Sequence, residues 1–168
     1  ANVAEVEARL TDVADELSVR RTQAADPLAK AVTESLAFLE LDRAVFKVSL
    51  NAAPLGPSGK DAVCFLFSST GRNAVDVSKC ASGGEISRIM LSLKSLMAEL
   101  VSMPTLVFDE IDTGVSGSVA AKMGSMICRM GRRMQVFAIT HLPQVAAQGD
   151  VHDVVNKTTE VEGESDRI

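Results

Sequence analysis

The sequence ASGGEISR at residues 81–88 and the sequence TLVFDEID at residues 105–112 decide the fold of this chain. The first is a glycine turn that runs straight into an amphipathic helix, and the second is an apolar strand that ends in two adjacent carboxylates. A third stretch, FAITH at residues 137–141, again places polar residues at the end of an apolar strand. Strand ends and helix N-termini along one edge of a parallel sheet are where nucleotide phosphates and metal ions bind. We therefore expect these stretches to meet at one functional edge.

Helical and strand patterns alternate from residue 75 onward. The sequence predicts helices over 85–100, 116–130 and 143–148, and strands over 105–108, 135–140 and 151–155. Alternation of this kind is typical of βαβ units, in which helices flank a mostly parallel sheet. The predicted fold class is therefore α/β.

Residues 1–40 are predicted to form a helical stalk. Apolar residues at positions 3, 6, 10, 13 and 17 recur at alternating steps of three and four, which is the spacing of a coiled-coil seam. Because Arg20 occupies the next seam position, one amphipathic helix lying on the domain is an equal alternative. Asp26 and Pro27 predict an interruption, with Asp26 as the N-cap of a second helix that Pro27 opens. The stalk is therefore expected to enter the lobe, residues 41–168, through a kink.

Residues 46–67 predict an antiparallel β-hairpin. Alternating apolar residues over 46–50 are followed by a turn at 54–59 and an apolar run over 62–67. The turn contains GPSGK, but a Walker A loop needs Gly where Pro54 stands and Ser or Thr where Asp61 stands. We interpret this segment as a turn, so the chain carries no Walker A loop.

The composition restricts the possible classes of protein. With 168 residues, 46% hydrophobic content and a net charge of -5, the chain can bury one sizeable core, and its acidity argues against a freestanding electrostatic nucleic-acid binder. Three widely spaced cysteines indicate neither a disulfide framework nor a zinc site, which favours a reducing cytoplasm. No apolar run approaches the roughly 20 residues that span a bilayer, so no membrane partner is expected.

Ser82 and Glu85 fit the capping box S-x-x-E at the start of the helix over 85–100. A structural cap alone explains these two residues. It does not explain Gly83 and Gly84, which cost backbone entropy unless a close approach or unusual dihedral angles require them. Because a helix N-terminus with free N–H groups and a hydroxyl binds anions, the functional alternative is a terminal phosphate at this position.

Asp109 and Glu110 follow a strand with almost no polarity, so limited solvation and mutual repulsion are expected there. Bound Mg²⁺ would relieve both, with Asp109 holding the metal through its water shell and Glu110 polarising the attacking water. An ordinary loop or helix-capping acid is the alternative. His141 has a similar alternative as a structural loop histidine, and His152, without a partner cluster, is interpreted as a packing or surface residue.

In this order the segments resemble the C-terminal lobe of ABC-type ATPases. Residues 82–85 match the signature motif, 105–110 match Walker B, 111–117 match the D-loop, and His141 matches the switch histidine. Glu85, where transporter ATPases usually carry Gln, indicates the chromosome-maintenance and repair branch. The stretch from 79 to 157 is most similar to RecN, a family of bacterial DNA repair proteins with SMC-like ATPase heads.

The resemblance implies that this chain is the C-terminal lobe of such a head, with Walker A in an N-terminal lobe. Two heads would enclose two ATP molecules with Mg²⁺, each nucleotide bound by Walker A of one head and the signature helix of the other. The implied catalytic residues are Glu110 and His141, and Asp109 is the implied metal residue. The implied nucleotide-binding residues are Ser82, Gly83, Gly84, Glu85, Asp112 and Gly114.

The implied partners are the N-terminal lobe of the same protein, a second head in an ATP-dependent homodimer, and DNA. ATP hydrolysis would drive DNA tethering in recombinational double-strand break repair, in the cytoplasm and on the nucleoid. Without Walker A, the chain alone is expected to be inactive. The role of Arg88 is left open.

Two other classes are alternatives. One is the head lobe of another SMC-like or ABC-type ATPase, which a long heptad run or membrane-associated elements upstream would distinguish. The other is a non-catalytic interaction module of the same fold, against which Asp109, Glu110 and His141 argue.

Overall fold

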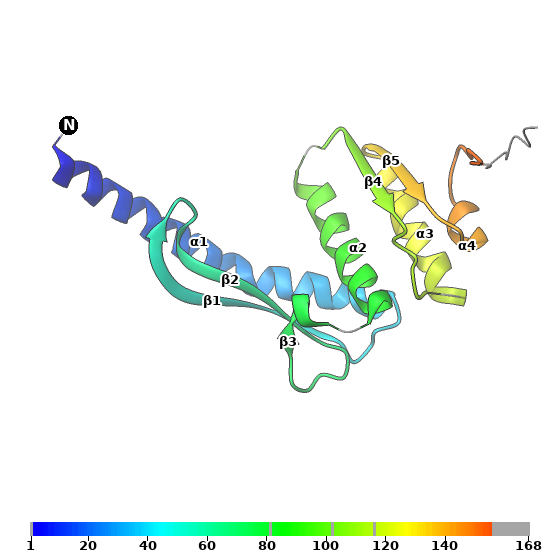
Figure 1. Cartoon of the computed structure of the whole chain (residues 1–168), viewed down its shortest axis with the longest axis horizontal. Coiled ribbons are helices and arrows are strands. Elements are labelled where there is room, and N and C mark those ends of the chain that lie inside the picture. The colour runs from blue at the N-terminus through cyan, green and yellow to red at the C-terminus, as the bar shows by residue number, and fades with distance from the viewer. Residues whose placement is uncertain (1, 81, 102, 116, 156–168) are drawn as a thin grey trace, which may run out of the picture.

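A computed structural model of the chain describes residues 2–80, 82–101, 103–115 and 117–155. The tail from 158 to 168, predicted to be frayed or truncated, lies outside these ranges, as does Ser116 at the predicted start of a helix. Figure 1 shows two strands running alongside one long helix, with the remaining helices and strands gathered beyond the C-terminal half of that helix. The prediction of an α/β fold is confirmed.

Helix α1 is a single helix of 36 residues, Val3–Phe38, so the predicted interruption at Asp26 and Pro27 is wrong. It begins with a capping box between Asn2 and Glu5 and contains Pro27 in its interior. A proline there removes one backbone donor and disfavours the helix. Contacts of α1 with the neighbouring hairpin and with a second helix hold the segment helical despite this cost.

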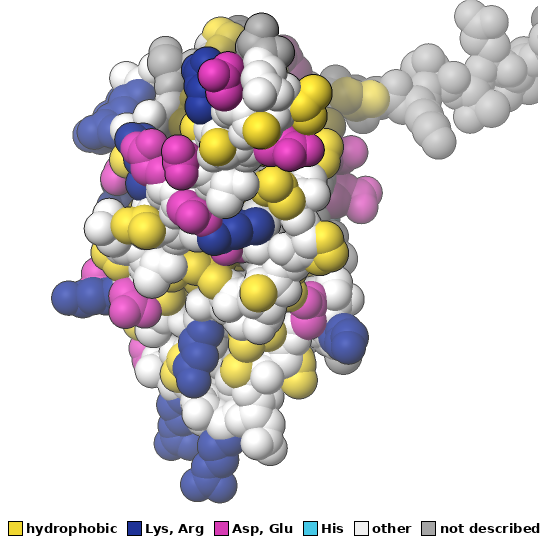
Figure 2. Space-filling view, turned by 90° about the vertical axis from the view of Figure 1, so that its left-hand side faces the viewer, with side chains coloured by type: hydrophobic (Ala, Val, Ile, Leu, Met, Phe, Trp, Pro, Cys, Tyr) yellow, Lys and Arg dark blue, Asp and Glu magenta, His cyan; other side chains and the backbone are white. Residues whose placement is uncertain are grey.

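The apolar seam of α1 is open at its N-terminal end. Val3, Val6, Leu10 and Val13 are 50–70% exposed, and Figure 2, which views the molecule from this end, shows apolar side chains standing among charged ones. Further along, Leu17 lies against Gly59 of the hairpin, where an added Cβ would come within 2.9 Å of the leucine side chain. The hairpin tip therefore occupies the seam face next to Leu17, and a coiled coil above it stays a prediction.

The predicted hairpin is confirmed. Strand β1, Val45–Gly56, pairs antiparallel with β2, Gly59–Ser68. Both strands run further than the sequence suggested, because the turn consists of residues 57 and 58 alone, and Gly59 after it has φ +91°, a conformation that glycine adopts readily. The short strand β3, Val75–Asp76, adds to β2, and a 3₁₀ turn, Val77–Lys79, follows it. Neither of these last two elements was predicted.

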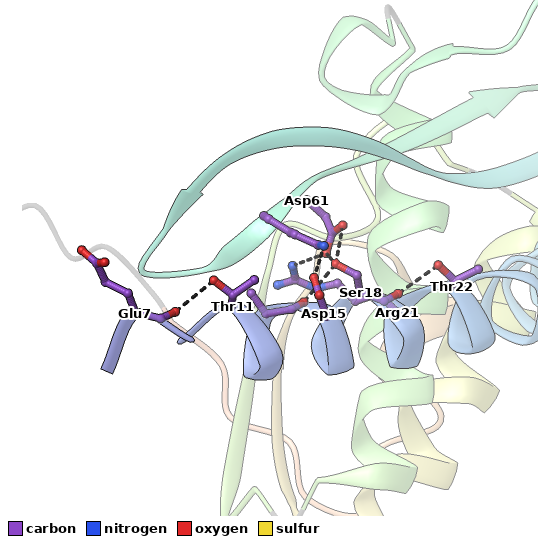
Figure 3. Close-up of polar contacts among 9 residues, drawn as sticks. Glu7, Thr11, Asp15, Ser18, Arg21, Thr22 and Asp61 are labelled. Carbon is purple, nitrogen blue, oxygen red and sulfur yellow. Dashed lines mark hydrogen bonds and ion pairs between the residues drawn. The ribbon is translucent and has the colours of Figure 1, made fainter. Parts of the chain in front are cut away.

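Polar contacts fasten the hairpin tip to α1 (Figure 3). Asp61 accepts a hydrogen bond of 2.7 Å from Ser18 Oγ and another of 3.1 Å from Arg21 Nη1, and Lys60 pairs with Asp15. The hydrogen bond from Ser18, and then that from Arg21, lower the pKa of Asp61. We call these five residues the latch, since they join segments 40 or more positions apart in the sequence.

Beyond residue 80 the chain forms the α/β part of the fold. Its elements are α2, Gly83–Leu100; β4, Thr105–Asp109; α3, Gly117–Gly131; β5, Gln135–Ile139; and α4, Pro143–Ala146. Strands β4 and β5 pair in parallel, from Thr105 opposite Gln135 to Asp109 opposite Ile139. The predicted order of helices and strands is thus confirmed up to α4.

The strand predicted over 151–155 is wrong. This segment has no strand structure, and its three valines are about as exposed as they would be in an open chain, at 79–94%. A strand needs a neighbour that accepts its backbone hydrogen bonds and covers its side chains, and nothing in the described part of this chain supplies one here.

The buried residues form two clusters instead of the single core that the composition suggested. One lies where α1 meets the hairpin and includes Leu36, Phe46 and Ile89; the other includes Phe108, Met123 and Val145, beneath α3 and α4. Helix α2 takes part in both clusters. No helix in the described ranges is both long and apolar enough to cross a membrane.

One face of the β4–β5 sheet is uncovered. Val107, Phe137 and Ile139 are 49–56% exposed there, although they are strand residues. Phe108, pointing the other way from β4, is 1% exposed. The sheet therefore buries one face against the helices of this chain and presents an apolar face outward.

Candidate functional site

Helix α2 begins at an accessible N-terminus. Ser82 is the N-cap, and its hydroxyl accepts a hydrogen bond of 3.4 Å from the backbone N–H of Glu85. Among the described residues Glu85 does not return a bond to Ser82, so only half of the predicted capping box is formed. Ser82 and Gly83 are exposed, which leaves the positive end of the helix dipole open to an anion.

The two glycines of this turn differ in their surroundings. A Cβ at Gly84 would lie 2.8 Å from the carbonyl oxygen of Gly114, which itself has φ +73°. A Cβ at Gly83 would meet nothing within 4 Å among the described residues. Packing therefore requires Gly84, because the backbone of the loop over 111–115 approaches it closely, whereas no contact within the described ranges requires Gly83.

The carboxylates at the end of β4 are exposed to solvent. Asp109 and Glu110 are both exposed, so the expectation of limited solvation around Asp109 is wrong; the strand that precedes it is covered on one face only. Glu110 has φ +47°, which is rare for a residue other than glycine. Its backbone N–H donates to the carbonyl of Ile139 at 3.2 Å, so the end of β4 is tied to the end of β5.

Asp112 is the one charged residue among the described positions that is fully buried. Thr140 Oγ1 donates to its Oδ2. Its Oδ1 lies 3.5 Å from His141 Nδ1 and has no hydrogen-bond partner among the described residues. The side chain of His141 is 68% exposed, so a buried carboxylate faces the inner nitrogen of an exposed imidazole.

These contacts bring the matched stretches together at one edge. Gly84 touches Gly114, Glu110 binds the end of β5, and Asp112 reaches the two residues that follow β5. The sequence placed Thr140 among the polar residues at this edge but did not show its hydrogen bond to Asp112. The roles assigned to the individual residues stay predictions.

The residues present fit a magnesium ion whose ligands are mainly water and phosphate oxygens. No group of three or more His, Cys, Asp or Glu side chains that could hold a metal occurs in the described part of the chain. Mg²⁺ in nucleotide sites needs only one or two protein carboxylates and completes its shell with water and phosphate oxygens. The exposed carboxylate of Asp109 meets that requirement.

A second group of contacts connects this edge to the stalk. Arg88 donates from Nε to the Gly84 carbonyl at 3.0 Å and from Nη1 to the Leu39 carbonyl, next to the end of α1, at 3.2 Å. Glu40 pairs with Lys122 of α3 at 3.0 Å. Hydrogen bonding from Ser118, and then from Lys122, lowers the pKa of Glu40. Arg88, whose role the sequence left open, thus joins the first turn of α2 to the end of the stalk helix.

Known proteins resemble this chain in sequence and in fold. No family model matches the chain. The chain is 40% identical over 149 residues to the DNA repair protein RecN of Vibrio cholerae, which covers 87% of this chain and 27% of that protein. It is 38% identical over 188 aligned residues to RecN of Mycobacterium leprae, covering 99% of this chain and 32% of that protein. The chain therefore spans about a third or less of these relatives.

Solved structures show the same fold. The SMC head bound to the C-terminal winged-helix domain of ScpA superposes with a TM-score of 0.64 at 18% identity, over 84% of this chain and 42% of that one. A structure from a study of ATP-driven dimerization and DNA-stimulated activation of SMC ATPases gives 0.57 at 19% identity, over 79% and 77%. The expected resemblance to RecN is thus confirmed, and the fold is that of an SMC ATPase head.

Proposed function

Since this chain is related to RecN over most of its length and has the SMC head fold, we propose that it is the C-terminal lobe of an ATPase head that drives DNA tethering in recombinational double-strand break repair. The observation that carries the proposal is the contact of Gly84 with Gly114, which places the open N-terminus of α2 against the loop after the two carboxylates. An anion-binding helix end and a pair of carboxylates on one edge are what phosphoryl transfer requires.

The proposed site is shared between two heads. The N–H groups at the start of α2 and the Ser82 hydroxyl bind the terminal phosphate of an ATP molecule whose other phosphates lie in Walker A of the opposite head. Gly83, with open space around it, leaves room for that phosphate. Gly84, Glu85 and Gly114 hold the backbone of this wall in place. ATP-dependent homodimerisation of heads follows from such a shared site.

Hydrolysis is assigned to the residues that follow β4 and β5. Glu110 orients the attacking water and accepts its proton, and His141 donates a hydrogen bond to the terminal phosphate. Asp109 would hold Mg²⁺ through water, and the ion would supply charge neutralisation of the phosphates.

The remaining parts of the proposal concern groups outside this chain. An N-terminal lobe with Walker A would cover the exposed face around Val107, Phe137 and Ile139. We extend the proposal to DNA as a partner, and to the cytoplasm and the nucleoid as the location, because both relatives described above are named DNA repair proteins. We propose that α1 continues into a coiled coil, in line with its open seam.

The experiment that tests this function compares Glu110→Gln with Asp109→Asn in the complete protein. Glutamine keeps the shape of glutamate but cannot accept a proton, so single-turnover hydrolysis should fall by about 10²- to 10⁴-fold. ATP affinity should be kept or raised, because one negative charge near the phosphates is lost. The variant should therefore accumulate as a long-lived ATP-bound dimer, measured by sedimentation.

Asp109→Asn serves as the matched control, since it removes a neighbouring charge without removing the proposed base. It should weaken Mg²⁺ retention and give few dimers. Near-normal hydrolysis by Glu110→Gln would rule out Glu110 as the base, and equal dimer lifetimes in both variants would refute the division of roles.

A further inference from the structure

The carboxylate of Asp112 is placed where it cannot touch a nucleotide directly. Its side chain has no exposed surface, whereas Asp109 and Glu110 at this edge are exposed. A buried carboxylate oxygen without a hydrogen-bond partner costs free energy unless some later state supplies one. The nearest candidate is His141 Nδ1, 3.5 Å from Asp112 Oδ1.

The surroundings of Asp112 hold it in one orientation. Thr140 Oγ1 donates to Oδ2, and the same hydroxyl accepts from the Leu142 backbone N–H at 3.0 Å. The free oxygen of Asp112 is thereby directed at the residue between these two, His141. Catalytic hydrogen bonds are often long in empty sites and shorten when substrate binds.

We infer that Asp112 is a positioning residue that holds the Nδ1–H of His141, so that Nε2 faces outward to the terminal phosphate. This inference rests on the proposed function, and it gives Asp112 a role through His141 in place of the direct nucleotide contact expected from the sequence. A buried carboxylate behind an imidazole fixes both the ring orientation and the nitrogen that carries the proton. Thr140 contributes by fixing the carboxylate.

The first measurement needs no variant. Nitrogen-15 NMR of the histidine side chains in this chain should show neutral His141 with its proton on Nδ1, because Asp112 accepts only from that nitrogen. In Asp112→Asn the amide oxygen can still accept from Thr140, which turns the amide N–H towards His141. The ring should then carry its proton on Nε2. Neutral wild-type His141 with its proton on Nε2 would overturn the inference, even if the variant failed to fold.

The second measurement follows hydrolysis in the complete protein. Asp112→Asn should lower kcat about 10- to 100-fold, as removing the orienting partner of a metal-binding histidine does, while KM for ATP changes little. In a His141→Gln background, Asp112→Asn should cause no further loss, because it acts only through the ring. Losses that multiply would overturn the inference.

These outcomes are separate from those of the proposed function. If Glu110→Gln hydrolysed ATP normally, Glu110 would be ruled out as the base, while the proton position on His141 could still be read. If Glu110→Gln blocked hydrolysis but Asp112→Asn did not lower kcat, only the role of Asp112 would be refuted.

Discussion

The latch differs in its polar contacts from the edge formed by the start of α2 and the ends of β4 and β5. We propose that this edge binds the nucleotide, and we call it the nucleotide edge. At the latch, Asp61 is largely covered and receives hydrogen bonds from Ser18 and Arg21 within the same chain. At the nucleotide edge, Asp109 and Glu110 are exposed, and Asp112 keeps one oxygen without a partner among the described residues. The polar side chains of the latch form hydrogen bonds within the chain and stabilise the fold. Those of Asp109 and Glu110 at the nucleotide edge are instead exposed, so they can bind a group from outside the chain.

The apolar side chains of the hairpin and of the parallel sheet also differ in burial. Phe46 and Phe67 of the hairpin are buried against α1, while Val107 and Phe137 of the parallel sheet remain half exposed. The hairpin thus has apolar side chains buried against α1, whereas the parallel sheet keeps an apolar face exposed among the described residues.

The largest expected effect tests whether the nucleotide edge is incomplete. Phosphate release by this chain alone should stay at the background of the buffer, because no Walker A loop is present to hold the β and γ phosphates. Adding the N-terminal lobe of the same protein should produce turnover. The same mixture made with the Glu110→Gln chain is the control for contaminating ATPases, and substantial turnover by the chain alone would contradict the shared site.

A smaller effect should separate the two glycines at the start of α2. Gly84→Ala places a methyl group 2.8 Å from the Gly114 carbonyl oxygen, so it should lower the free energy of unfolding by about 1–3 kcal/mol, as overpacking does. Gly83→Ala is the matched control, because its methyl group meets nothing within 4 Å. It should raise stability by about 0.4–1 kcal/mol or leave it unchanged. Urea unfolding of both variants measures the difference, and equal losses would show that the Gly84–Gly114 contact does not limit packing.

The smallest effect concerns the latch and depends on pH. Hydrogen bonds from Ser18 and then from Arg21 lower the pKa of Asp61 in the folded protein. Ionised Asp61 therefore adds to the free energy of unfolding above the ordinary aspartate pKa, and this stabilisation is lost as the pH falls through the lowered pKa. Asp61→Asn should therefore be less stable than the wild type at pH 7, and the difference should shrink below about pH 4.

Thermal unfolding across this pH range measures the effect, with Asp12→Asn on α1 as a control that removes the same charge from an exposed position. Hydrolysis in the complete protein should be unaffected by Asp61→Asn. A stability difference that persists unchanged at pH 3 would show that the latch does not depend on the charge of Asp61.

Elements with a strong local pattern could be predicted from the sequence. Helix α2 and strand β4 were predicted to within a few residues, because their hydrophobic periodicity and the turn before α2 depend only on residues close in the sequence. Pro27 misled the prediction because packing along α1 outweighs its local preference. The segment over 151–155 misled it because β structure depends on a neighbour that the local sequence does not reveal.

The site was predictable in outline but not in its inner contacts. The order of motifs identified Ser82, Asp109, Glu110 and His141 as candidates. It could not show that Asp112 is buried while Asp109 is exposed, since both are aspartates in one short stretch. Nor could it show the latch, whose partners are separated by about 40 residues and carry no shared pattern.

The continuous stalk helix has a mechanical consequence. Helix α1 is about 54 Å long at 1.5 Å per residue, and it is gripped near its middle by the latch and near its end by the bond from Phe46 N–H to Thr33 Oγ1. Because the hairpin contacts α1 at two separated positions, α1 cannot rotate about either contact alone and moves together with the hairpin. Each degree by which the lobe rotates about the end of α1 therefore sweeps Val3 sideways by about 1 Å. The stalk helix therefore amplifies rotations of the lobe, and the latch keeps the helix rigid relative to the hairpin.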